Sequence, residues 1–391
     1  MQKAIHTYLD LDVVNNNLTS DVIAPMLKFE EIRNTPFLEG DSSEYFCSIM
    51  RFSIQTGNSL PIFIPRIEVG QADVNKTVYQ LTLRCLGGTD TTTFYESTVP
   101  LYHKTSDATV STPLQPLNKQ DMSSNYYFDC NIQDIIDMFN TACTSAFVAL
   151  NKLLPKSAAD PAKPDVLTSI LDSTYCPFFE FDYDTCKLVL NVDQNYLTSS
   201  KMAGEVYFNT RFYELLSTLH CDRISRTGFK NYRLHPSTIN TRTVKDTTGT
   251  YTMCQTIQEM STLAIWNPIA SVVFCTGMLP VVSTNTSPPL TYDDTSNNNL
   301  TSSGNNSNLS NIISDFEIPV SESNQYRPII VYNPSAEYRL IDMNSQLNLN
   351  NIDISVFWKT HYGEFIPLRL QPGCAAHIKL LFRHKTFYLG Y

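Results

Sequence analysis

The stretch IDISVFWKTHYGEFIPLRLQPGCAAHIKLLFR, residues 352–383, decides the fold class of this chain. Apolar side chains take every second position in three runs, which are Ile352–Trp358, Ile366–Leu370 and Ala376–Phe382. A period of two indicates strands that bury one face. Gly363 and the pair Pro372–Gly373 separate the runs and favour tight turns. The stretch therefore predicts three antiparallel strands joined by two turns.

His361 and Glu364 lie between the first two of these runs, three residues apart. In other settings such a pair holds a metal ion or moves a proton, because imidazole and carboxylate both bind metals and both titrate. Here the two residues flank Gly363 at the tip of the predicted hairpin. We therefore interpret them as turn residues.

Strand-like runs recur along the chain, and one segment has a different period. The strand-like runs are residues 45–55, 60–69, 77–86 and a hairpin over 178–192 with DYDTC as its turn. Between Asn131 and Leu154, apolar residues follow the i, i+3, i+4, i+7 spacing of a helix with one buried stripe, which Asp129 or Asn131 can cap and Pro155 ends. Residues 208–219 predict a second, short helix. The fold class is all-β, a β-sandwich or jelly roll of antiparallel sheets with one long helix.

Composition along the chain predicts four parts. Residues 1–42 are polar and form an extended N-terminal arm. Residues 43–154 form a β-rich region that ends in the helix 131–154, and the proline-containing segment 155–165 is a linker. Residues 166–391 form a β-rich jelly-roll region. Its segment 286–311 consists mostly of Asn, Ser and Thr, so it cannot bury enough apolar surface to order itself and is expected to be a long exposed loop.

The charge composition argues against nucleic acid as a direct partner. Charged residues make up 17% of the chain and the net charge is −10. A neutral polar surface suits a protein that packs against its own copies, because few charges lose water at the contacts. No Lys/Arg cluster is longer than Arg383–Lys385, so direct binding of nucleic acid is not expected.

Three further features bear on the compartment. The uncharged run 260–292 is interrupted by Pro268 and Pro280, so it predicts two buried strands and a turn rather than a membrane span. The start of the chain does not resemble a secretory signal. Ten cysteines without a C-x-x-C pair are expected to be reduced core residues, which favours assembly inside a cell.

The sequence carries no strong catalytic signature, and we predict neither an enzyme, nor a cofactor, nor a metal site. The remaining candidates have structural interpretations. Asp182 and Asp184 are expected to form a turn, Asp293 and Asp294 to be solvated loop charges, and the pair His220–Cys221 to be structural. The two tryptophans, Trp266 and Trp358, are expected in the core.

Four stretches resemble a known group of proteins. They are RFSIQTGNSLPIFIP (51–65), ISDFEIPV (313–320), AEYRLIDM (336–343), and the stretch that opened this section. Together they resemble penton-type or minor capsid proteins of polinton-like and adintovirus-like double-stranded DNA viruses. The resemblance implies a jelly-roll fold, self-assembly into a ring at the fivefold vertices of an icosahedral virion, and no catalysis. It covers the two ends of the chain and not the middle.

Length leaves alternatives open. A single jelly roll needs about half of 391 residues, so the chain holds either an inserted domain or a second jelly roll. The second case implies a hexon-like major capsid protein that forms trimers, whereas the first favours a pentamer. Expected partners are other copies, other capsid proteins and a host receptor that contacts loop 286–311. A glycan-binding or adhesive β-sandwich and a glycoside hydrolase are the rival functions. The expected location is the virion, assembled in the nucleus or cytoplasm of a host cell.

Overall fold

The computed structural model describes residues 6–17, 24–57, 59–88, 92–105, 110–158, 167–282, 290–292, 300–302, 311–318, 328–334 and 339–388. Its contacts divide the chain into two compact units. Unit 1 comprises Met1–Pro61 and Pro268–Tyr391, and unit 2 comprises Ile62–Asn267. Unit 2 is therefore inserted into the sequence of unit 1. This division differs from the predicted boundaries at 42, 154 and 165, because the strands before and after the insertion share one pair of sheets.

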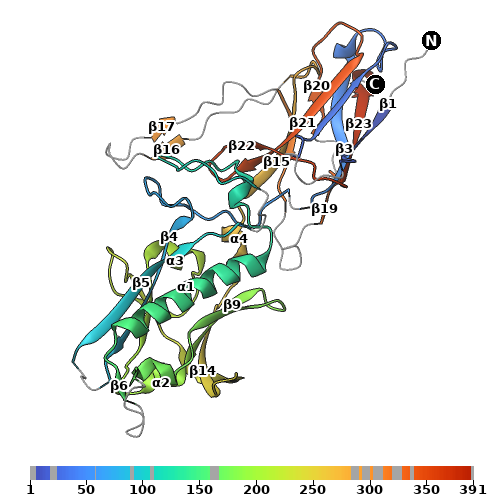
Figure 1. Ribbon diagram of the computed structural model, residues 1–391. Coiled ribbons are helices and arrows are strands. Elements are labelled where there is room, and N and C mark those ends of the chain that lie inside the picture. Colours follow the sequence, from blue (N-terminus) through green and yellow to red (C-terminus); the bar gives the residue numbers. More distant parts are fainter. Residues whose placement is uncertain are drawn as a thin grey trace. The chain divides into compact units, whose positions relative to one another are not determined.

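Unit 1 is a sandwich of two antiparallel sheets (Figure 1). Sheet 1 has the order β1 (His6–Val14), β23 (Ala375–His384), β3 (Tyr45–Gln55), β19 (Ile329–Tyr332), and β20 (Ile341–Asp342) also pairs with β3. Sheet 2 has the order β18 (Asn311–Phe316), β15 (Ile269–Thr276), β21 (Asn351–Thr360), β2 (Lys28–Ile32), and β22 (Phe365–Pro367) also pairs with β21.

The alternation in the C-terminal stretch is explained by this sandwich. Strands β21 and β22 form the predicted hairpin, with Trp358 opposite Ile366 and Gly363 at a φ of 80° in the turn. The second predicted hairpin is wrong. After a turn at Pro372–Gly373, β23 crosses to sheet 1 and pairs with β1 and β3 rather than with β22. A strand with one apolar face can cover the core from either sheet, so the alternation alone does not choose between them.

The N-terminal segment also differs from the prediction of an extended arm. Strand β1 pairs with β23 along its whole length, and β2 pairs with β21. Leu9 and Leu11 are each 7% exposed, whereas Asp10 and Asp12 between them face solvent. The alternation of apolar and acidic residues over 9–12 is the feature of the sequence that indicates this strand. The ends of the chain thus complete sheet 1.

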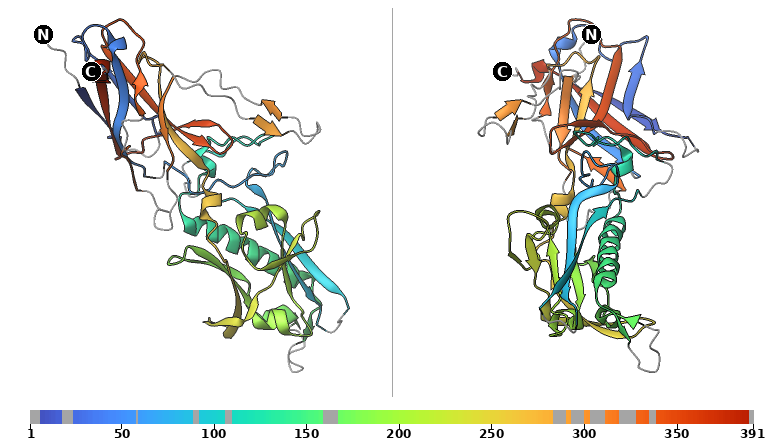
Figure 2. Two further views of the ribbon diagram at one scale, coloured as in Figure 1. Left: turned by 180° about the vertical axis from the view of Figure 1, so that it is seen from behind. Right: turned by 60° about the vertical axis from the view of Figure 1, so that its left-hand side comes forward.

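Unit 2 contains two more antiparallel sheets and most of the helical residues (Figure 2). Sheet 3 has the order β11 (Cys221–Arg223), β12 (Tyr232–Leu234), β10 (Glu205–Phe208), β4 (Lys76–Leu86), β5 (Phe94–Tyr102). Sheet 4 has the order β13 (Ser237–Lys245), β14 (Thr250–Ile257), β9 (Lys187–Asp193), β8 (Phe178–Asp182). The helices are α1 (Ile132–Leu153), α2 (Gln194–Thr198), α3 (Thr210–Leu215) and α4 (Leu263–Trp266).

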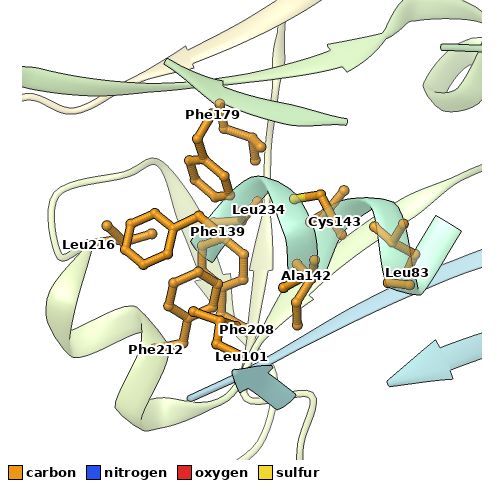
Figure 3. Packing of buried hydrophobic residues seen from close by; sticks show 14 of the residues in the cluster. Leu83, Leu101, Phe139, Ala142, Cys143, Phe179, Phe208, Phe212, Leu216 and Leu234 are labelled. Atoms are coloured by element: carbon orange, nitrogen blue, oxygen red, sulfur yellow. The ribbon is translucent and has the colours of Figure 1, made fainter. Parts of the chain in front are cut away.

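Helix α1 is the centre of the unit 2 core and confirms the predicted helix. Its N-cap is Asn131, whose side-chain oxygen accepts a hydrogen bond from the backbone N–H of Gln133 at 2.9 Å. Phe139 lies at the middle of the buried stripe, with its ring 5.4 Å from Phe179 of β8 and 5.2 Å from Phe212 of α3 (Figure 3). Since α1 contacts β4 and β5 of sheet 3 and β8 of sheet 4, one amphipathic helix joins both sheets.

Three other predicted segments also take a different form. In the run 260–292, for which two buried strands joined by a turn were predicted, the described residues contain α4, the strand β15 and the short strand β16 (Leu290–Tyr292), and Trp266 anchors the turn of α4 in the unit 2 core. Within the predicted exposed loop 286–311, β16 (Leu290–Tyr292) pairs with β17 (Leu300–Ser302). In the predicted linker, Ser157–Ala158 forms β6 and pairs with β7 (Leu167–Thr168). The other parts of that loop before 311, and residues 159–165 of the linker, lie outside the described residues.

Candidate functional site

Where the structure describes them, the residues singled out in the sequence belong to separate elements. His361 and Glu364 are in the β21–β22 turn, where the backbone N–H of Thr360 donates to the carbonyl of Glu364 at 2.8 Å. The structure confirms the prediction that Asp182 forms a turn. Its carboxylate accepts hydrogen bonds from the Thr185 hydroxyl and the Asp184 backbone N–H, and these bonds lower its pKa. Asp293 and Asp294 lie outside the described residues.

Six of the ten cysteines and both tryptophans are core residues. All ten cysteines are free thiols. Burial raises the pKa of Cys47, Cys85 and Cys275 to about 12, so these thiols stay protonated and unreactive near neutral pH. Trp266 and Trp358 are 4% and 1% exposed, as expected of core residues. Within the described ranges, no group of three or more His, Cys, Asp and Glu residues could hold a metal ion.

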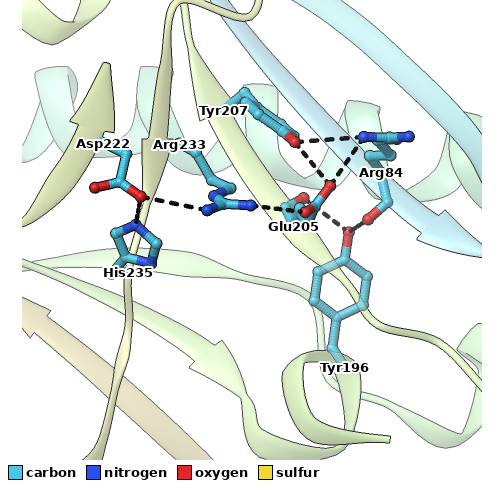
Figure 4. Close-up of polar contacts among 7 residues, drawn as sticks. All are labelled: Arg84, Tyr196, Glu205, Tyr207, Asp222, Arg233 and His235. Carbon is cyan, nitrogen blue, oxygen red and sulfur yellow. Dashed lines mark hydrogen bonds and ion pairs between the residues drawn. The ribbon is translucent and has the colours of Figure 1, made fainter. Parts of the chain in front are cut away.

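Charged side chains do converge on one face of sheet 3, in a cluster that we call the sheet 3 network (Figure 4). It consists of Arg84, Glu205, Tyr207, Asp222, Arg233 and His235. The carboxylate of Glu205 pairs with Arg84 at 3.1 Å through one oxygen and with Arg233 at 3.3 Å through the other. Because β10 lies between β12 and β4, this one acid links the basic residues of the strands on either side.

The network continues toward the edge of the sheet. The second N–H group of Arg233 contacts Asp222 at 3.2 Å, and Asp222 also contacts the His235 ring at 2.7 Å. These partners hold the pKa of Asp222 below its usual range, through its hydrogen bonds to His235 first and to Arg233 second. Each carboxylate is therefore already paired with at least one arginine. The network fixes the strands relative to one another and leaves neither acid poised for proton transfer.

Sheet 1 carries a smaller set of ion pairs, the sheet 1 ladder, made of Asp10, Asp12, Arg51, His377 and Lys379. Asp10 contacts Lys379 at 3.2 Å and Arg51 at 3.9 Å, and Asp12 contacts His377 at 2.7 Å. The ladder crosses β1, β23 and β3 on the solvent face, where Asp10 and Asp12 of β1 lie opposite Lys379 and His377 of β23. It is an exposed set of compensated charges and not a catalytic constellation.

A buried histidine and a buried carboxyl lie close together in the core of unit 2. His103 and Asp129 are 3% and 2% exposed, and His103 Nδ1 lies 3.8 Å from Asp129 Oδ2. The other ring nitrogen of His103 donates to the carbonyl of Tyr126 at 2.7 Å. Burial lowers the pKa of His103 and raises that of Asp129 well above its ordinary value, so the fold favours the uncharged form of each. The pair is sealed from solvent, which argues for a structural role.

Neither the network nor the ladder is visible in the sequence. Arg84 and Glu205 are far apart along the chain, and only the strand order β12-β10-β4 brings them together. The sequence drew attention to His220 and Cys221, whereas the network uses their neighbours Asp222 and His235. The one usable signal was the alternation of Glu205 and Tyr207 on one face of a short strand.

The likeness to known proteins extends over nearly the whole chain and is not confined to one site. The family model described as Sputnik minor capsid protein V18/19 matches residues 7–384. A chain of the cryo-EM structure of the Sputnik virophage matches with a TM-score of 0.70 and 21% identity, covering 100% of both chains. The crystal structure of the mavirus penton protein matches with a TM-score of 0.60 and 14% identity, covering 97% of this chain and 99% of that one. No curated protein matches. Among the described residues, no helix is long and apolar enough to span a membrane.

Proposed function

Because the chain belongs to the Sputnik minor capsid protein V18/19 family, we propose that it is the penton subunit of an icosahedral virion and closes into a pentamer at the fivefold vertices. The protein is a jelly-roll capsid component of a virus and not an enzyme, and it assembles with other capsid proteins in the virion. The family match over 7–384 carries the proposal, because it takes in both units and not the sandwich alone. The fold likeness to the mavirus penton protein supports the same role.

The architecture of unit 2 favours a penton over a hexon-like trimer. A double jelly roll needs a second sandwich in which two sheets pack directly on each other. In unit 2 the 22-residue helix α1 instead supplies much of the core and contacts both sheets. Among the described residues, unit 1 thus supplies the jelly roll and unit 2 is inserted in its sequence.

A closed ring requires two different contact surfaces on each subunit, because its contacts run head to tail. Sheet 1 offers an apolar pair at each of its edges. On β1, Tyr8 and Val14 are 54% and 55% exposed, and on β19 Ile329 and Val331 are both 57% exposed. The ladder between them is compensated within one subunit. The apolar side chains are therefore the favourable contacts, since burying apolar surface stabilises a contact, whereas removing water from the exposed Asp10 and Asp12 between Tyr8 and Val14 would cost free energy.

The test is the oligomeric state of the purified chain, measured by size-exclusion chromatography with light scattering and by electron microscopy. We expect pentameric rings. A variant with Ile329→Asp and Val331→Asp is expected to be monomeric, because the new carboxylates lose water at the contact. The matched control is Ile239→Asp on β13 of unit 2, where Ile239 is 90% exposed; it is expected to keep the ring. Wild-type trimers would support the hexon-like alternative, and a wild-type monomer that binds glycans would support the adhesive one.

The thiols support assembly inside the host cell. Six of the ten cysteines are buried and all ten are free. A reducing compartment keeps such thiols unpaired, whereas secreted domains generally use them as disulfides.

A further inference from the structure

Unit 2 contains a pocket of about 580 Å³ that neither the proposed assembly nor the sheet 3 network uses. Its walls come from α1, from the segment between Leu171 and Phe178, and from the β13–β14 hairpin. The lining residues include five hydroxyl side chains, two carboxylates and two phenylalanines, and no lysine, arginine or histidine. A volume of this size lies within the range that small ligands occupy in proteins, ~300–1,000 Å³.

One side of the pocket is aromatic. The rings of Tyr175 and Tyr251 have centroids 5.2 Å apart, and Phe178 lies 5.8 Å from Tyr175. All three rings are partly exposed. The position of Tyr175 is set by its backbone, since its N–H donates to the buried carboxylate of Asp193 at 2.7 Å. The pocket therefore presents aromatic ring surfaces to a ligand, and the backbone that carries Tyr175 is held by Asp193.

The β13–β14 hairpin contributes a chain of hydrogen bonds that runs from the Tyr251 hydroxyl through the Thr248 hydroxyl to the carboxylate of Asp246. The Thr248 hydroxyl donates to Asp246 Oδ1 at 2.6 Å, so its oxygen accepts from the Tyr251 hydroxyl at 2.8 Å. Asp246 Oδ1 also accepts the backbone N–H groups of Thr248 and Gly249. These bonds lower the pKa of Asp246, which keeps it ionised. The chain leaves the oxygen of Tyr251 able to accept another bond.

Two polar groups of the pocket have no hydrogen-bond partner among the described residues. They are the second carboxylate oxygen of Asp246 and the hydroxyl of Tyr175. The carboxylate oxygen is a strong acceptor, and the hydroxyl can both donate and accept. Asp172, at the other side, is already bound to the Asn151 side chain and the Ser169 backbone, so it contributes charge rather than a free oxygen.

We propose that this pocket binds a neutral saccharide residue. A sugar ring has an apolar C–H face that packs on aromatic rings, and its hydroxyls donate to carboxylates and exchange hydrogen bonds with hydroxyls. An anionic sugar or phosphate is disfavoured, because two carboxylates line the pocket and no basic side chain does. A simple cation is also less suitable, because it has no use for a hydroxyl donor such as Tyr175. The proposal adds a binding activity to the capsid role and does not depend on the oligomeric state.

The test is ligand-observed NMR by saturation transfer on the full chain. The probes are the methyl glycosides of glucose, galactose, mannose and N-acetylglucosamine, with sialyllactose as the anionic comparison. We expect saturable binding of at least one neutral probe. Tyr175→Ala is expected to abolish it by removing the ring, and Asp246→Asn to weaken it about tenfold by replacing the charged acceptor.

Matched controls separate binding from folding. Tyr183→Ala removes a 65% exposed tyrosine of the β8–β9 turn outside the pocket and is expected to leave binding unchanged. Tyr175→Phe keeps the ring and loses only the hydroxyl, so it should retain weakened binding. Three outcomes overturn the proposal: no neutral probe binds saturably, binding survives both Tyr175→Ala and Asp246→Asn, or sialyllactose binds more tightly than every neutral probe.

Discussion

Phe52 of β3 and Phe274 of β15 meet across the sandwich of unit 1, with ring centroids 5.0 Å apart and ring planes at 79°. The whole of unit 2 separates these residues along the chain. Both rings are fully buried, and Phe52 also contacts Phe29 of β2 and Phe316 of β18. One side chain of sheet 1 thus joins three strands of sheet 2, and an edge-to-face arrangement of this kind is a favourable one for aromatic rings.

Phe52→Ala is expected to lower the free energy of unfolding of unit 1 by about 3–5 kcal/mol, because the cavity would open between the sheets. Urea denaturation measures the change. The matched control is Met50→Ala on the same strand, where Met50 is 37% exposed; its cost should stay below about 1 kcal/mol. Equal losses for the two variants would contradict this account of the core.

Gly204 lies where the chain enters β10, and its position requires the absence of a side chain. A Cβ atom there would lie 2.5 Å from the carbonyl oxygen of Tyr196 and equally close to two of its ring atoms. Gly204→Ala is expected to destabilise unit 2 by about 1–3 kcal/mol, because Tyr196 is fully buried and cannot move aside. Gly249→Ala is the control, since its nearest neighbour is at 3.5 Å. Thermal unfolding distinguishes them, and a similar Tm for both would refute the steric argument.

The buried carboxyl of Asp129 gives a prediction of pH dependence. Burial raises its folded-state pKa well above the ordinary 3.8, so the stability that its protonated form contributes is present below 3.8 and is lost as the pH rises through the folded-state pKa. Asp129→Asn stays neutral at every pH. The stability advantage of this variant over the wild type should therefore grow from pH 4 to pH 7. The exposed Asp137 of α1 provides the control Asp137→Asn, and a constant difference across pH would count against the prediction.

The buried His103 predicts a change of stability with pH in the opposite direction to that expected from Asp129. Burial lowers its pKa from the ordinary 6.5, so the unfolded chain takes up a proton that the folded protein resists. Stability is then lost as the pH falls below about 6.5. His103→Gln, which cannot be protonated, should lose less stability between pH 7 and pH 5 than the wild type does. Denaturant titrations at both pH values measure this, and a steeper loss in the variant would exclude a neutral buried histidine.

The sheet 3 network predicts a modest and salt-dependent coupling. Arg84 and Glu205 keep 29% and 22% of their side-chain surface exposed, so solvent screens their interaction. A double-mutant cycle with Arg84→Met and Glu205→Gln is expected to give about 0.2–1 kcal/mol, decreasing at high salt. The exposed pair Arg211 and Glu214 on α3 is the reference and should couple more weakly. A salt-independent coupling would mean that packing, and not charge, holds these strands together.

Local patterns predicted the elements that they fully specify. Helix α1 follows from its apolar spacing, the cap at Asn131 and Pro155, and the β8–β9 and β21–β22 hairpins follow from alternation around turn residues. These elements depend on neighbours a few residues away, so a linear pattern contains the information. The burial of Trp266 and Trp358 and the turn at Gly363 were also predicted, from apolar and turn patterns around these residues.

The elements that depend on distant partners were not predictable in the same way. The destination of β23 in sheet 1, the addition of β1 and β2 to the sandwich, and the insertion of residues 62–267 are choices among pairings that share one alternation pattern. The pocket at Tyr175 and Tyr251 is of the same kind, because α1 and two loops distant in sequence form it.

The sequence by itself thus determined the class of the fold, the long helix and the neutral polar surface of a protein built to assemble. Only the tertiary structure decided which strands share a sheet, where one unit interrupts the other, and which charges and hydroxyls meet. The physical reason is that period and propensity act over a few residues, whereas strand order is set by burying one common core from both sides.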